Sequence, residues 1–305
     1  GYLAEFVMIH GSQLAPTSFG EFDEDSPTIW KPIDVSELTF GTNGFYLDFE
    51  ASDNLGNDAN GGTDLTEVNL AATDSATDSP TNNFATMNPL LIALGATVPA
   101  LSEGNLRVAN TIANKMQASY SNFAVSSGKW YVEIKMTAGT AFRPGISTLN
   151  IGQAEGEAGE NQNSPGLWTE GWGYFYDDGV LYNDNGDAGG TYAAFAAGDI
   201  VSIGLDMDNS KLFFGVNGTW QNSADPAAGT NSIDISGIAA GSDVAFGAAV
   251  ENSSAGATYS DVNFGSPVYA NSSSAADGNG YGDFEYAPPS GFLALCTKNL
   301  GSTGG

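Results

Sequence analysis

The sequence predicts an all-β protein whose main part is a β-sandwich, and two observations carry this prediction. Apolar and polar residues alternate over several short stretches, which is the pattern of strands with one buried face. Turn-forming residues separate these stretches, and the chain contains 40 Gly and 12 Pro. Consecutive hairpins with one apolar face each need a second sheet to cover that face, so a sandwich follows.

The expected strands follow this alternation along the whole chain. They are Phe45–Phe49, Trp130–Met136, Val201–Met207, Leu212–Val216 and Val244–Val250. Asp178-Gly179 lies between two aromatic and apolar stretches and predicts a hairpin there. Helical periodicity is nearly absent, and the only expected helices are two short ones, Asn88–Leu94 and Ala109–Gln117.

Composition limits the possible partners and chemistry. The 305 residues carry 8 Lys and Arg against 36 Asp and Glu, a formal net charge of −28. A surface this acidic repels phosphate backbones and anionic headgroups, so we expect neither nucleic acid nor a membrane as partner. No apolar run is long enough for membrane insertion. A single cysteine, Cys296, and a single histidine, His10, exclude disulfide frameworks and multi-histidine or thiolate metal sites within one chain.

Four segments resemble strands of the SPRY domain, and they follow one another in the order of that family. They are Ser127–Ile134, Gly171–Asn183, Gly198–Asp208 and Lys211–Gly218. The resemblance covers about residues 100 to 265 and implies a SPRY-like jelly-roll sandwich.

Two flanking regions resemble proteins of tailed phages. Residues 283–297 are similar to the closing segment of their SPRY-like proteins, and residues 1–95 resemble the last part of a laminin-G or concanavalin-like jelly roll. The front of that jelly roll is missing, so we expect the chain to begin inside a longer protein. The resemblance implies three parts: a partial laminin-G-like sandwich with an irregular crossing (1–95), a SPRY-like β-sandwich (96–300) and a flexible tail (301–305).

Aromatic residues give the leading hypothesis for a binding site. Rings at the edge of a sandwich can stack on sugar faces or anchor a protein, while Asn side chains hold hydroxyl groups. The candidate ligand-binding residues are Trp168, Trp172, Tyr174, Tyr176, Tyr182, Asn183, Asn185 and Tyr192. Two alternatives stay open, namely packing between subunits and packing of about half of these rings in the core.

Calcium is the one cofactor that the sequence suggests. Asp184 and Asp187 belong to an Asn- and Asp-rich loop with a glycine, and Asp53 and Asp58 form a second acidic cluster. Oxygen ligands of this kind suit Ca²⁺, although the first loop lacks the distal Glu of an EF-hand. The alternative is that both are solvated loops.

The expected function is non-enzymatic. The acidic residues lie mostly in turns, and no nucleophile elbow or phosphate loop is present. The phage resemblance implies a virion structural or adhesion protein of a tail fibre, baseplate or capsid, exposed on the virion surface. Its expected partners are other virion proteins, copies of itself and a host-surface glycan. The alternatives are a secreted bacterial carbohydrate-binding or adhesin module and, more weakly, an enzyme attached to such a module.

Overall fold

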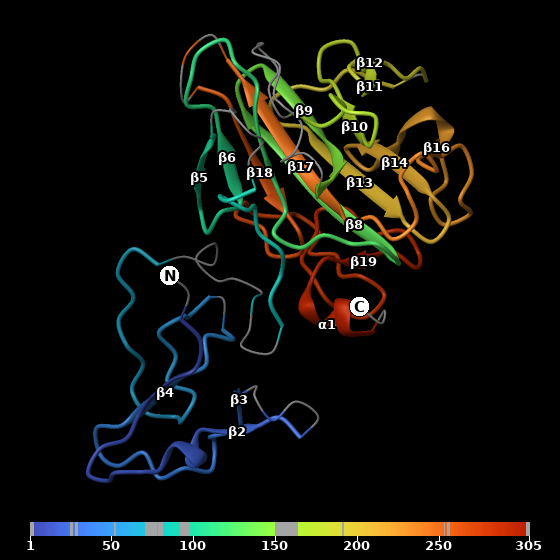
Figure 1. Cartoon of the computed structure of the whole chain (residues 1–305). Coiled ribbons are helices and arrows are strands. Elements are labelled where there is room, and N and C mark those ends of the chain that lie inside the picture. The colour runs from blue at the N-terminus through green and yellow to red at the C-terminus, as the bar shows by residue number, and fades with distance from the viewer. Residues whose placement is uncertain are drawn as a thin grey trace. The chain divides into compact units, whose positions relative to one another are not determined.

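The computed structural model confirms the all-β fold class. It describes residues 3–24, 27, 30–51, 53–70, 78, 82–91, 98–149, 164–190, 192–252, 254 and 257–302. The chain divides into two compact units, residues 1–83 and residues 84–305 (Figure 1). This division lies closer to the N terminus than the boundary expected between residues 95 and 96.

The first unit consists of turns and two small antiparallel sheets. One sheet pairs β1 (Phe6–Met8) with β4 (Phe45–Leu47), and the other pairs β2 (Gly20–Phe22) with β3 (Trp30–Pro32). The expected strand Phe45–Phe49 stops early because Phe49 adopts a left-handed conformation with φ of 60°. The laminin-G-like character of this unit stays a prediction.

The second unit contains a nine-stranded sheet built around β8 (Lys129–Ala138). All its pairings are antiparallel except that of β19, which runs parallel to the start of β8. The main path is β15 (Thr219–Trp220), β14 (Lys211–Val216), β13 (Ile200–Asp206), β8, β18 (Tyr259–Asn263), β6 (Arg107–Ala109) and β5 (Ala100–Ser102), with β16 (Ile233–Asp234) on β14 and β19 (Leu293–Ala294) on β8.

A six-stranded antiparallel sheet forms the other layer of the sandwich. Its order is β12 (Gly186–Asp187), β11 (Leu181–Asn183), β10 (Gly171–Tyr174), β9 (Ala141–Thr148), β17 (Val244–Glu251) and β7 (Gln117–Tyr120). The pairing of Tyr174 with Leu181 confirms the hairpin expected around Asp178-Gly179.

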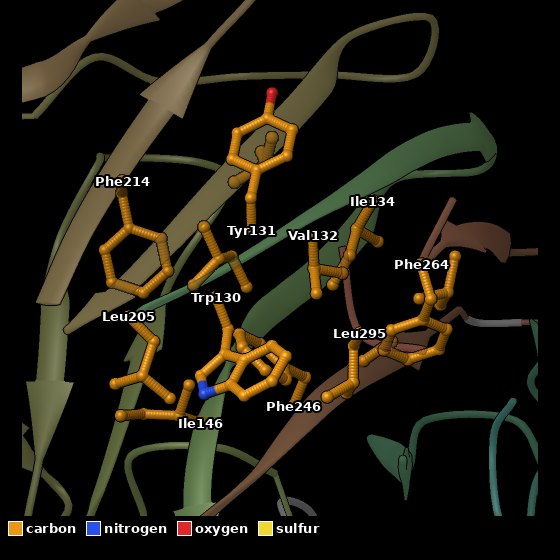
Figure 2. Close-up of a cluster of buried hydrophobic side chains, with 14 of the residues drawn as sticks. Trp130, Tyr131, Val132, Ile134, Ile146, Leu205, Phe214, Phe246, Phe264 and Leu295 are labelled. Carbon is orange, nitrogen blue, oxygen red and sulfur yellow. The ribbon is translucent and has the colours of Figure 1, made fainter. Parts of the chain in front are cut away.

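The core lies between the two sheets, where alternate residues of each strand meet. Trp130, Val132 and Ile134 of β8 enter it together with Phe246 of β17 (Figure 2). Figure 2 also shows Tyr131 pointing to the opposite side of β8 from Trp130. Tyr131 is nevertheless fully buried, so the outer side of the nine-stranded sheet is covered as well.

The helix expected at Ala109–Gln117 is wrong. The stretch begins in β6, continues through turns and ends in β7. The cause is the buried side chain of Gln117, whose Oε1 accepts hydrogen bonds from the backbone N–H groups of Thr111 and Ile112 at 2.6 and 3.1 Å. In a helix over 109–117 these two N–H groups would be among the first four, which have no partner inside the helix, so the Gln117 side chain satisfies donors that a helix would leave unpaired.

The other expected helix, Asn88–Leu94, lies partly outside the described residues, and its first residues form a turn in which Asn88 Oδ1 accepts from the N–H of Leu90. One α-helix was not expected: α1 (Thr297–Ser302) extends into the predicted flexible tail, of which residues 303–305 lie outside the description. No helix in the described ranges is long and apolar enough to cross a membrane.

Candidate functional site

The outer face of the six-stranded sheet, opposite the core, carries a row of three glycines. Gly247, Gly145 and Gly173 are register neighbours on β17, β9 and β10. Tyr120 pairs with Gly247 at one end of the row, and Tyr182 pairs with Gly173 at the other. We call this row, bounded by its two tyrosines, the glycine trough.

A buried segment of the chain itself, Ser164–Gly166, lies in the glycine trough. A methyl group added to Gly145 would lie 2.6 Å from Cβ of Pro165, and one added to Gly247 would lie 2.8 Å from its Cγ. Such approaches are closer than van der Waals contact, so glycine is needed for the proline to pack here.

Arg143 of β9 extends across the same face. Its guanidinium carbon lies 5.0 Å from the ring centroid of Phe175 and 4.4 Å from that of Tyr182. Nη1 donates to Ser164 Oγ at 2.8 Å, whereas Nε is buried without a hydrogen-bond partner in the described part of the chain. The whole residue is only 3% exposed. Burial lowers the pKa of the Arg143 guanidinium, because desolvation penalises its charged form.

A small apolar cluster continues this face beside Arg143. Trp168 and Phe175 pack against a group formed by Met116, Ala118, Tyr120, Ala245 and Ala249. The indole Nε1 of Trp168 is a second donor that is buried with no hydrogen-bond partner among the residues that the structure describes. The outer face therefore combines small residues, aromatic rings and two unpaired N–H donors.

The prediction of aromatic ligand-binding residues is wrong for two of them. Trp172 and Tyr174 alternate with Gly171 and Gly173 along β10, so they face the core, where they are 6% and 0% exposed. Buried rings cannot stack on a ligand. Tyr174 also donates its hydroxyl to the backbone carbonyl of Ala193.

The other predicted rings lie in two different places. Tyr176 and Tyr192 are half-buried and pack against the main core. Trp168 and Tyr182 are also half-buried but belong to the outer face. The structure thus brings two of the six predicted aromatic residues to this face and adds Phe175, which the sequence did not single out.

The predicted polar residues of this region shape a tight hairpin. Asn183 donates through Nδ2 to the carbonyls of Thr169 and Gly171 at 2.9 and 2.8 Å. Asp184 and Asn185 form the exposed turn between β11 and β12 with φ of 51° and 56°.

The four predicted calcium ligands act as turn residues. Asp184 accepts from the hydroxyl of Thr169 at 3.2 Å, and Asp187 from the N–H of Gly189 at 2.7 Å. Asp58 is buried and accepts from the N–H of Tyr46 at 2.9 Å, while Asp53 is exposed. Within the described part of the chain, no three acidic, histidine or cysteine side chains come together in a group that could hold a metal ion.

Comparison with protein families gives one match, to the SPRY domain, over residues 129–226. This part of the chain is similar to the SPRY domain. The match begins with β8 and includes β9, β10 and β14, so the matched residues include both the Arg143 strand and most of the glycine trough. SPRY domains are in general non-catalytic interaction modules.

A solved structure similar to this chain is the crystal structure of the SPRY domain of human HERC1. It shares 15% sequence identity, with a TM-score of 0.41, and the alignment covers 58% of this chain and 96% of that one. Comparison with the curated proteins gives no match.

Arg143 was missed at the sequence level, although a signal for it existed. It stands as a lone cation in the strand Phe142-Arg143-Pro144-Gly145-Ile146, on the face opposite Phe142 and Ile146. A charged residue in such a strand faces either solvent or a specific partner. Gly173 and Gly247 of the trough lie on other strands and could not be placed near Arg143 before the register was known.

Proposed function

We propose that this chain is a non-enzymatic structural and adhesion protein of a tailed-phage virion, on a tail fibre, baseplate or capsid. Its SPRY domain is the binding part. The protein assembles with copies of itself and with other virion proteins, and a host-surface glycan is a further candidate ligand.

The observation that carries a binding role is the outer face of the six-stranded sheet. A purely structural face needs no unpaired donors, because buried polar groups are normally hydrogen-bonded. Within the described residues Arg143 Nε and Trp168 Nε1 both lack hydrogen-bond partners, and Tyr182 and Trp168 stay partly exposed beside them. Arginine, tryptophan and tyrosine are the residues that most often dominate binding energy at protein interfaces.

The virion assignment is supported by the sequence resemblance of residues 1–95 and 283–297 to phage proteins. The net charge of −28 fits a surface-exposed protein that stays soluble at high local copy number.

Mass spectrometry of purified particles of the phage that encodes this chain tests the virion role. We expect the protein in every particle preparation, at a copy number that reflects the symmetry of the structure carrying it. Its absence from intact particles would remove the virion role and favour the secreted bacterial module.

A glycan array, run with and without calcium, separates adhesion to sugars from a purely structural role. Glycan binding through the outer face should be lost in Tyr182→Ala. It should be kept in Trp30→Ala, which removes an exposed ring of β3 in the other unit. An array without any signal would leave protein partners as the ligands of this face.

A further inference from the structure

The two arginines of this chain are in opposite situations. Arg107 donates from Nε and Nη2 to the two oxygens of Asp261, at 2.6 and 2.9 Å. Arg143 has no carboxylate within ion-pair distance among the residues that the structure describes. The unpaired arginine is nevertheless the more buried one, since Arg143 is 3% exposed and the Arg107 side chain is 28% exposed.

Among the residues that the structure describes, the surroundings of Arg143 leave one edge of its buried guanidinium group without a hydrogen-bond partner for Nε. The rings of Phe175 and Tyr182 lie against the group, and Nη1 is bonded to Ser164. What remains is the edge formed by Nε and Nη2, where Nε has no partner. This is the same edge with which Arg107 holds Asp261, and its two parallel N–H groups match the two oxygens of a carboxylate.

A buried cation without a paired anion is costly, because only two aromatic rings and one hydrogen bond to Ser164 replace the hydration that burial removes. The chain has 36 acidic residues, and the two described ones whose charges act on Arg143, Glu251 and Asp178, lie beyond ion-pair distance of it. The arrangement provides the cation of an ion pair without its anion. Two aromatic rings and a serine hold the guanidinium group in place.

We propose that the Nε–Nη2 edge of Arg143 binds the carboxylate of an aspartate or glutamate side chain of a protein partner. This inference rests on the proposed function, because it takes the outer face as the binding face and names the chemistry of its partner. A protein side chain is favoured over an acidic sugar because Ser164–Gly166 already lies in the glycine trough. Only a slim, flexible group can then reach an arginine that is 3% exposed.

Nuclear magnetic resonance of the full ¹⁵N-labelled chain tests this directly. With only two arginines, the chain gives two Nε–H signals, and Arg107→Lys identifies which one belongs to Arg143. The probe is the peptide acetyl-Gly-Glu-Gly-amide, and its Gln counterpart is the control. Salt at about 0.15 M limits long-range repulsion of the probe by the acidic protein.

We expect the Arg143 signal to shift saturably with the Glu peptide and to stay in place with the Gln peptide. The Arg107 signal should not move, because its edge is occupied by Asp261. Arg143→Lys keeps the charge but loses the two-pronged geometry, so calorimetry should show binding of the Glu peptide at least about tenfold weaker. The wild-type titration decides the question even if that variant does not fold.

Three results would overturn the proposal. The first is an Arg143 signal that does not move at the highest soluble concentration of the Glu peptide. The second is a shift with N-acetylneuraminic acid but not with the peptide, which would make an acidic sugar the ligand. The third is a triple variant, Glu155→Gln, Glu157→Gln, Glu160→Gln, whose Arg143 signal differs in position from that of the wild type when no peptide is present. That result would mean that the chain supplies its own carboxylate from a segment outside the described residues. None of these outcomes affects the detection of the protein in virions.

Discussion

The carboxylate of Glu133 accepts a hydrogen bond from the backbone N–H of Tyr286, which lies 153 residues further along the chain, at 2.8 Å. The N–H of Glu285 donates to the same carboxylate at 2.9 Å. Tyr131 and Asn263 donate to it from the sheet, at 2.9 and 3.3 Å. Glu133 is fully buried, so this one side chain fastens the C-terminal segment to the outer side of the nine-stranded sheet.

Replacing Glu133 by glutamine should destabilise the protein by about 1–3 kcal/mol. Each carboxylate oxygen accepts two hydrogen bonds, and an amide NH₂ in place of one oxygen would face two donors. Urea unfolding of the full chain measures the effect. Glu103→Gln is the matched control, because the Glu103 side chain is 52% exposed and lies 4.0 Å from Arg107, and it should leave the midpoint unchanged. Equal midpoints for the two variants would contradict the role of Glu133.

The same residue predicts a pH dependence of stability. Burial raises the pKa of Glu133 above its ordinary value of 4.5, while its four hydrogen bonds oppose the rise. The folded state therefore holds this proton more tightly than the unfolded state does. Stability from protonated Glu133 is fully present below pH 4.5 and is lost as the pH rises through the folded pKa.

Urea unfolding measured from pH 4 upward should thus show that the wild type exceeds Glu133→Gln in free energy of unfolding by less and less as the pH rises. Glu285 should behave in the opposite way, because the side chain and backbone of Ser272 lower its pKa. The stabilisation by ionised Glu285 is present above pH 4.5 and disappears on acidification. The difference in the free energy of unfolding between the wild type and Glu285→Gln should therefore become smaller as the pH falls.

The glycine trough predicts a steric effect. Gly247→Ala places a methyl group 2.6 Å from Cε1 of Tyr120 and 2.8 Å from Cγ of Pro165, so one of the two rings must move. We expect a loss of about 1–3 kcal/mol in the free energy of unfolding. Gly237→Ala is the control, because an added Cβ there meets no atom within 4 Å. An unchanged thermal midpoint in Gly247→Ala would show that Pro165 does not lie in the trough.

We expect that even a conservative replacement of Arg107 weakens its ion pair with Asp261 and lowers the stability of the protein. Lysine keeps the charge but cannot bond both oxygens of a carboxylate that is 1% exposed, and we expect Arg107→Lys to cost about 1–2 kcal/mol. Lys31→Gln, which removes exposed ion pairs to Glu21 and Asp23, should have no measurable effect on the unfolding midpoint. A stable Arg107→Lys protein would indicate that Thr137, which also donates to Asp261, suffices to hold that carboxylate.

The strands could be predicted because alternation is a local property. Trp130–Met136, Val201–Met207 and Val244–Val250 each form a strand within a residue or two of the expected bounds. The SPRY resemblance was confirmed for residues 129–226, and two of its motifs, Ser127–Ile134 and Gly198–Asp208, overlap with the first two of these strands.

The candidate site was predicted less well because faces and partners are not local. Alternation shows that Trp172 and Tyr174 share a face, but only the register of the sheet shows that this face is the core. The pairing of Gly145 with Gly173 and Gly247, and the fourfold coordination of Glu133, join residues that are far apart in the chain. The acidic loops looked like metal sites because aspartate is equally suited to closing tight turns.

The parallel pairing of β19 with the start of β8 has a consequence for synthesis. Trp130 and Tyr131 leave the ribosome long before Leu293 and Ala294, their neighbours in the finished sheet. The start of one edge of β8, beyond the part that pairs with β18, therefore stays unpaired until nearly all of the second unit has been made. A topology with such distant contacts folds slowly and only as a whole. Chains that terminate before Leu293 should consequently aggregate or be degraded and not yield a smaller stable domain.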